Sequence, residues 1–196
     1  NQQYIHYRKG SVVLYALQDY IGKEKINAAL RSFLHKYAFK SAPYPTTQDL
    51  IAEIRLAAGP EYSALITDML EKIVLFDLKV DKVTVAENSD GQYDVTMTVA
   101  IKKFEADGEG RETPVDASGL FDIALLGEKD DETKLHDVIQ IEKRMISDAT
   151  TTITISTATK PYAVGIDPFN KLIDRNPDDN IKTIDFRSAA ERGRFH

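Results

Sequence analysis

The stretch FDLKVDKVTVAENSDGQYDVTMTVAI, residues 76–101, decides the fold, because the spacing of apolar side chains changes there. Apolar and polar residues alternate in its second half, where the apolar positions are Tyr93, Val95, Met97, Val99 and Ile101. An alternation of period two places apolar side chains on one face of a β-strand and polar side chains on the other. The segment NSDG at 88–91 has the composition of a hairpin turn. The stretch therefore predicts two antiparallel strands joined by a turn.

The strand pattern continues towards the C-terminus. A polar segment from Asp107 to Arg111 predicts a further turn or loop. Beyond it, four more strands are predicted at Leu120–Leu126, Leu135–Arg144, Thr150–Ala158 and Tyr162–Ile166. Short strands at this spacing, with no helix between them, are typical of an antiparallel sandwich.

The residues before Phe76 follow a helical period instead. The first helix is indicated by apolar residues at helical spacing that end before Gly22, namely Val12, Val13, Ala16, Leu17 and Tyr20. A second helix is predicted from about Lys23 to the segment SAPYP, with Ile26, Ala29, Leu30, Phe33, Leu34 and Tyr37 on its apolar side.

Two further helices are predicted between this break and Phe76. Thr46 and Asp49 have the spacing of a capping box and predict the start of a third helix, which ends at Gly59 and has Leu50, Ile51, Ile54 and Leu56 on its apolar side. Pro60 is suited to the first position of a fourth helix, whose apolar residues run to Ile73.

These patterns predict an α+β chain with three parts. Residues 1–75 form a helical segment, residues 76–186 an antiparallel β-sandwich, and residues 187–196 a charged, loose tail. A length of 196 residues suits one compact domain or two small ones.

Composition limits the classes of partner. The formal net charge of -6 argues against a nucleic-acid surface, which needs clustered Lys and Arg to neutralise phosphates. The absence of cysteine excludes disulfides, thiolate metal sites and nucleophilic cysteine chemistry. No apolar run approaches the ~20 residues that a membrane-spanning helix needs, so the chain is expected to be soluble. Its start, NQQYIHYRKG, has no initiator Met and no signal-peptide pattern, which suggests a piece cut from a longer protein.

The four histidines do not predict a metal site. His6, His35, His136 and His196 are scattered, and no two have the i, i+4 spacing that places both on one helical face around a metal ion. The chain also has no glycine-rich phosphate loop and no GxSxG nucleophile elbow. On spacing alone, no complete active site is present.

An acidic loop near the C-terminus is the one candidate for an ion site. Oxygen-bearing residues recur at alternate positions and close a 12-residue span, as in a calcium loop: Asp174, Asn176, Asp178, Asn180 and Asp185. Three departures count against calcium: the sixth position, which needs Gly, is Asp179; the fourth position is Pro177; and the twelfth position is Asp rather than Glu. The same composition is common in ordinary turns, so a structural loop is the preferred interpretation and a calcium site the alternative.

The N-terminal segment contains an ordered set of short motifs. Tyr7, Lys9 and Gly10 form Tyr-x-Lys-Gly, and they are followed in order by Ile21-Gly22 with Glu24, by Phe33, Tyr37 and Phe39, and by Thr47, Asp49 and Leu50. Without the rest of the segment, a Tyr next to a Lys at the start of a helix predicts only a packed aromatic ring and a solvated ammonium group. The ordered set, however, resembles the gluzincin aminopeptidases, the zinc family that includes aminopeptidase N and leukotriene hydrolase.

The resemblance implies a function and a site residue. In this family zinc is held by two His of an H-E-x-x-H helix and by a downstream Glu, and none of these is present here. What matches is the tyrosine of Tyr-x-Lys-Gly, Tyr7, whose phenol is expected to donate a hydrogen bond to the oxyanion formed from a peptide substrate. The resemblance therefore implies a parent zinc aminopeptidase whose catalytic domain lies upstream, with a fragment that is inactive alone.

The remainder of the chain has a second likeness. The segment GIDPFNKLIDRNPDDN, residues 165–180, looks like a bacterial subgroup in which a gluzincin domain follows the membrane-spanning permease segments of an ABC transporter. This likeness implies a membrane-anchored parent and makes the acidic loop a family segment. An alternative function is also open: a parent that has lost the zinc motif and uses the sandwich for assembly or partner binding.

Overall fold

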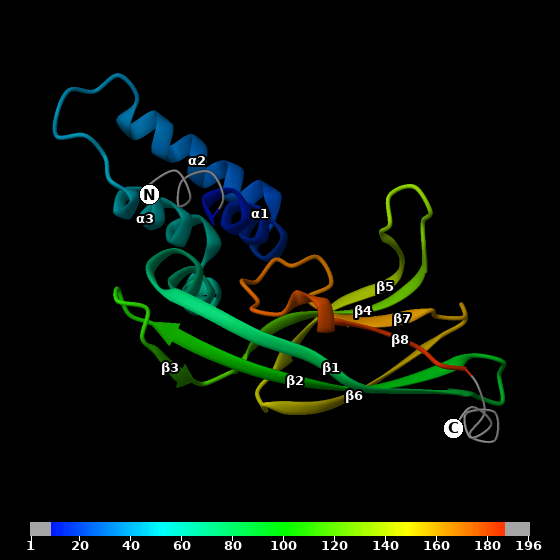
Figure 1. Ribbon diagram of the computed structural model, residues 1–196. Coiled ribbons are helices and arrows are strands. Elements are labelled where there is room, and N and C mark those ends of the chain that lie inside the picture. Colours follow the sequence, from blue (N-terminus) through cyan, green and yellow to red (C-terminus); the bar gives the residue numbers. More distant parts are fainter. Residues whose placement is uncertain (1–8, 187–196) are drawn as a thin grey trace. The chain divides into compact units, whose positions relative to one another are not determined.

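The structure is a computed structural model that describes residues 9–186 (Figure 1). The predicted tail at 187–196 and the candidate Tyr7 lie outside the described residues. The chain divides into two compact units. A helical unit comprises residues up to 74 together with 105–113, and a sandwich unit comprises 75–104 and the residues from 114 onwards.

From residue 10 onwards, the helical unit has three successive helices, and their ends are fixed by local chemistry. They are α1 (Gly10–Ile21), α2 (Lys23–Tyr37) and α3 (Thr47–Ala58). Gly22 and Gly59 follow α1 and α3 with φ angles of 106° and 101°, a region that favours glycine because it has no Cβ. The predicted stop at Gly22, the start near Lys23 and the limits of the third helix are confirmed, whereas the second helix ends at Tyr37, before the segment SAPYP.

The start of α3 is a capping box with Asp in place of Glu. The Thr46 backbone N–H donates to Asp49 Oδ2 at 2.7 Å, and the Thr46 hydroxyl is 3.0 Å from the same oxygen. These bonds lower the pKa of Asp49. The other Asp49 oxygen accepts a bond from the Tyr37 hydroxyl at 3.1 Å. The cap therefore starts α3 and also ties it to the end of α2.

The region after α3 differs from the predicted fourth helix. Instead of one helix to Ile73, three short turns follow: η2 (Pro60–Tyr62), α4 (Ser63–Ile66) and the π-helical η3 (Thr67–Glu71). Pro60 does stand at the start, as predicted. Ile73 belongs to a strand, because the β-branched Ile73 and Val74 favour extended backbone over a further helical turn.

Two leucines predicted on apolar helix faces are exposed. Leu34 of α2 is 60% exposed and Leu56 of α3 is 78% exposed. The buried positions of these helices are Ile26, Ala29, Ile51, Glu53, Ile54 and Ala58. A helix buries a stripe about one third of its circumference wide, so apolar residues beside that stripe remain in solvent.

Between residues 9 and 186, eight strands form two four-stranded sheets. They are β1 (Ile73–Glu87), β2 (Tyr93–Ala106), β3 (Glu112–Val115), β4 (Gly119–Lys129), β5 (His136–Ile146), β6 (Thr150–Thr157), β7 (Ala163–Ile166) and β8 (Ile181–Thr183). One sheet has the order β1-β2-β3, with β6 also pairing with β2, and the other has the order β5-β4-β7-β8. The pairings of β2 with β6, of β4 with β5 and β7, and of β7 with β8 are antiparallel, which confirms the predicted α+β fold with a β-sandwich.

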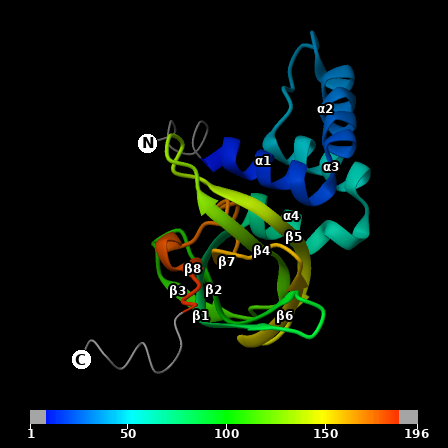
Figure 2. The same ribbon diagram turned by 90° about the vertical axis from the view of Figure 1, so that its right-hand side faces the viewer.

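The core of the sandwich lies between these sheets. Alternate residues of β2 are buried, as their spacing predicts. Across the core, the rings of Phe76 on β1 and Phe121 on β4 meet edge to face, with centroids 6.0 Å apart. Figure 2 shows the two sheets curving around this space.

Within the described residues, 9–186, no helix has both the length and the apolar character needed to cross a membrane.

Candidate functional site

The motif Tyr-x-Lys-Gly is placed in part. Tyr7 lies outside the described residues, whereas Gly10 is the first residue of α1 and Lys9 immediately precedes it. The Lys9 ammonium donates to the Lys72 carbonyl oxygen at 3.4 Å, near the end of the helical unit. The last residue of the motif, Gly10, is therefore the first residue of α1, and Tyr7 stands three positions before it in the sequence.

The other elements of the resemblance fall at helix ends. Ile21 and Gly22 end α1, and Glu24 lies in the first turn of α2. Near the end of α2, the ring centroids of Phe33 and Tyr37 are 5.1 Å apart. The ordered motifs are thus the segments that set the boundaries of α1, α2 and α3.

The acidic loop does not gather its oxygen-bearing side chains. Asp174 Oδ1 accepts from the Asn176 backbone N–H at 3.0 Å, and Asp174 Oδ2 accepts from the Leu78 backbone N–H at 3.2 Å. Asn180 is buried, whereas Asn176, Asp178 and Asp185 are exposed. Asp174 therefore has a structural role, which it fulfils with both carboxylate oxygens.

We expect this loop to bind calcium no more tightly than millimolar. A calcium ion needs six to eight oxygen ligands around one point, and Asp174 would have to give up its backbone partners to supply one. Calorimetric titration of the chain with calcium is the direct measurement. A micromolar site that disappears in Asp174→Ala would contradict this expectation, provided that circular dichroism shows the variant to be folded.

A cluster of buried charges in the sandwich unit was not predicted from the sequence. Asp122 on β4 is fully buried, and its Oδ1 is 3.0 Å from the Lys143 ammonium on the neighbouring strand β5. Its Oδ2 forms an ion pair with Lys171, a residue that is only 5% exposed. The one signal in the sequence is a charged residue within the apolar run LFDIALL of residues 120–126.

Asp167 completes this cluster from the loop after β7. It is fully buried and has a φ angle of 43°, in the left-handed region that Asp tolerates better than most residues. Its Oδ1 accepts from the Lys171 backbone N–H at 3.0 Å, and its Oδ2 from the Leu172 backbone N–H at 2.9 Å. Burial outweighs these bonds and raises the pKa of Asp167 to about 7.

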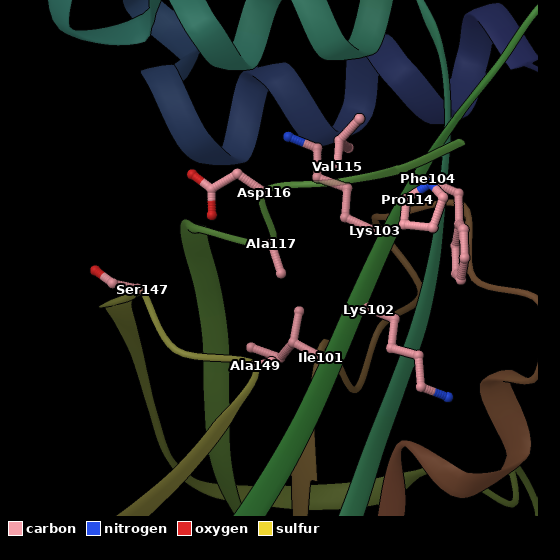
Figure 3. Close-up of a pocket in the computed structure, with 10 residues that line it drawn as sticks. All are labelled: Ile101, Lys102, Lys103, Phe104, Pro114, Val115, Asp116, Ala117, Ser147 and Ala149. Atoms are coloured by element: carbon pink, nitrogen blue, oxygen red, sulfur yellow. The ribbon is translucent and has the colours of Figure 1, made fainter. Parts of the chain in front are cut away.

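A pocket of about 370 Å³ opens at the end of β2 in the sandwich unit (Figure 3). Apolar side chains form much of its wall, among them Ile101, Ala117 and Ala149. The Asp116 carboxylate accepts bonds from the Ser118 hydroxyl and backbone N–H, which lower its pKa. The lining also includes the polar residues Lys102, Lys103 and Ser147, so the pocket combines an apolar wall with a few polar groups.

Two curated proteins are similar to part of this chain. Over 68 residues, 35% of the chain, it is 37% identical to Aminopeptidase M1-D of Oryza sativa subsp. japonica. Over 63 residues, 32% of the chain, it is 38% identical to Aminopeptidase M1-C of the same plant. The aligned part is 7% of the length of each relative. No family model matches the chain.

The similarity supports a relationship with aminopeptidase M1 at the level of the family. It agrees with the resemblance found in the N-terminal motifs, and it gives no support to a fusion with a transporter permease or to a bacterial origin.

Zinc, the metal that the resemblance implies, does not fit the described residues. Between residues 9 and 186, no group of three or more His, Asp and Glu side chains is arranged to hold a metal ion. His35 lies on α2 in the helical unit and His136 on β5 in the sandwich unit. The His136 ring is engaged with the Gly127 carbonyl oxygen, 2.7 Å from Nδ1. Any zinc ligands of an aminopeptidase would have to come from other residues.

Proposed function

We propose that this chain is the C-terminal part of a zinc-dependent aminopeptidase of the gluzincin type, to which it supplies Tyr7 and a supporting β-sandwich. The observation that carries the proposal is the identity of 37% over 68 residues with a protein named as an aminopeptidase. The ordered motifs from Tyr7 to Leu50, which resemble the same family, agree with it.

In this proposal Tyr7 acts on the substrate. When a peptide carbonyl is attacked, its oxygen becomes an oxyanion, and a positioned donor stabilises that charge more strongly than the neutral carbonyl. A tyrosine phenol is neutral at pH 7 and has one O–H to donate. Gly10, three positions after Tyr7 in the sequence, is the first residue of α1.

The parent's partners follow from the same proposal. The substrate is a peptide with a free N-terminus, and the partner of this chain is the catalytic domain that holds the zinc. A permease domain and a membrane anchor in the same polypeptide rest only on the likeness of residues 165–180 and form a separate part of the proposal.

The function is tested on the full-length protein that contains this chain. We expect it to release the N-terminal amino acid from amino-acyl arylamides, to lose this activity on chelation and to regain it with zinc. A full-length protein that is folded but binds no zinc and cleaves no such substrate would overturn the proposal. In that case the alternative, a non-catalytic module for assembly or partner binding, would take its place.

The isolated chain of 196 residues is expected to be inactive towards the same substrates. Its described residues include no metal-ligand group that could activate a water molecule. The measurement is an arylamide assay after incubation with zinc, with the full-length protein as the positive control. Zinc-dependent turnover that co-purifies with the chain would show that it contains a complete site.

A further inference from the structure

The strand β6 lies at an open edge of the sheet formed by β1, β2, β3 and β6. Along one side it pairs with β2, in an unbroken antiparallel register from Thr157 to Thr150. Within residues 9–186 no strand pairs with its other side, so β6 stands at the margin of the sheet (Figure 1). One row of its backbone N–H and C=O groups is therefore not used by the sheet.

The register shows which residues of β6 form that row. The Ile101 N–H on β2 donates to the Ala149 carbonyl oxygen at 2.8 Å, and the same register continues along β6. Backbone groups of an antiparallel strand point alternately to its two sides. The odd-numbered residues of β6 therefore direct their backbone groups towards β2. The even-numbered residues direct theirs to the open side, and these are Thr150, Thr152, Thr154 and Ser156.

The composition of β6 differs from that of the other strands that have a single neighbouring strand among the described residues. Proteins usually protect such edges against pairing with other chains by charged side chains or proline. Each of β1, β3, β5 and β8 contains charge, for example Lys79, Glu112, Lys143 and Lys182. The stretch ATTTITISTAT at 149–159, which includes β6, contains no charged residue, no proline and no glycine. Its many β-branched residues also favour strand pairing.

We propose that β6 is a self-association edge, at which two copies of this chain pair antiparallel and join their sheets into one continuous sheet. A two-fold axis passes between the two strands at Thr154, perpendicular to the sheet, so each copy offers the same residues to the other. Because both open edges are then used, the assembly closes as a dimer and does not grow into a fibre. The inference is independent of the proposed peptidase function, since it uses only β6.

A second copy fits this edge because β6 is self-complementary about Thr154. Exposed and buried side chains alternate along the strand. On the exposed face, Thr152 comes to lie opposite Ser156 of the second copy. On the buried face, Ile153 comes to lie opposite Ile155 of the second copy. Like side chains therefore meet on each face, and no charge repulsion opposes the pairing.

Hydroxyl pairs of the kind that the dimer needs already exist within the sheet. The hydroxyl oxygens of Thr96 and Thr154 are 2.9 Å apart, and those of Thr98 and Thr152 are 3.3 Å apart. A hydroxyl has one donor and two acceptor sites, so each threonine of β6 can make a further contact on its other side. The copy thus repeats across the open edge a contact that β6 makes with β2.

Sedimentation equilibrium of the 196-residue chain tests the dimer. An edge contact between two strands is small, so we expect a reversible dimer with a Kd on the order of 100 μM. Thr154→Lys places two ammonium groups opposite each other and should raise the Kd about tenfold or more. Thr84→Lys is the matched control and should leave the Kd unchanged, because it adds the same charge at an exposed threonine of β1.

Amide hydrogen exchange shows whether the dimer uses this edge. As the chain concentration rises from well below to well above the Kd, the even-numbered amides of β6 should gain protection. The amides of Thr151, Ile153 and Ile155 face β2 and should be protected at every concentration. An association through another surface would not produce this alternation.

Each outcome decides the proposal. A chain that stays monomeric up to about 1 mM would overturn it. A dimer whose even-numbered β6 amides gain no protection would overturn it too, as would growth beyond the dimer into fibres. The same holds for an unchanged Kd in a Thr154→Lys variant that circular dichroism shows to be folded. If this variant does not fold, the concentration dependence of exchange in the unmodified chain decides alone.

Discussion

Replacing Asp122 with alanine should lower the free energy of unfolding of the sandwich by about 3–5 kcal/mol. The side chain of Lys171 is only 3% exposed, and its ammonium forms an ion pair with Asp122. Removal of Asp122 would leave that ammonium buried without its counter-charge, which is far more costly than the loss of a solvated ion pair. The measurement is urea denaturation followed by circular dichroism at constant pH.

Two matched variants separate this explanation from a general loss of packing. Asp77→Ala removes a partner from the Asp77–Lys102 pair, in which the lysine side chain is 66% exposed, and should cost less than about 1 kcal/mol. The double variant Asp122→Leu with Lys171→Met replaces the buried pair by apolar groups and should recover most of the stability. A loss below about 1 kcal/mol in Asp122→Ala would show that Lys171 reaches another partner or solvent.

The sandwich could be predicted because its long strands keep one face buried. In β2 the alternation from Tyr93 to Ile101 is the same in the sequence and in the buried pattern of the structure. The strands β3 and β8 could not be predicted, since they contain four and three residues and bury almost no side chain. A period cannot be recognised in so short a segment.

The helix boundaries were predictable for a different reason. Gly22, Gly59 and the Thr46–Asp49 box act within a few residues of the chain, so their effect is visible in the local sequence. The turns after Pro60 were not predictable, because the helical and the strand patterns overlap near Ile73. The tertiary structure decides there in favour of the strand.

The charge cluster shows what spacing alone cannot reveal. Asp122 was visible as a charge within an apolar strand, but its partner Lys171 is far along the chain in an irregular segment. Only the antiparallel pairing of β4 with β7 brings the loop after β7 back to β4. For Tyr7 the local sequence predicts only a packed side chain. Its chemical role is assigned by the resemblance to a family and not by residue spacing.

Replacing Tyr7 with phenylalanine in the full-length protein should reduce kcat by about a hundredfold or more. The substitution keeps the aromatic ring and its packing and removes only the phenol O–H. Because that donor matters most when negative charge has developed on the substrate oxygen, kcat should fall much more than KM changes. Steady-state kinetics with an amino-acyl arylamide, together with thermal unfolding, measure both effects.

Two neighbouring tyrosines provide the controls for this prediction. Tyr15 lies on α1 and is 60% exposed, so Tyr15→Phe should leave kcat and stability unchanged. Tyr4, three residues before Tyr7, would become the next candidate for the donor if Tyr7→Phe is folded and fully active. A loss of stability with an unchanged kcat in the folded fraction would instead make Tyr7 a packing residue. A large loss of kcat at normal stability, found in Tyr7→Phe and not in Tyr15→Phe, is the result that the oxyanion role requires.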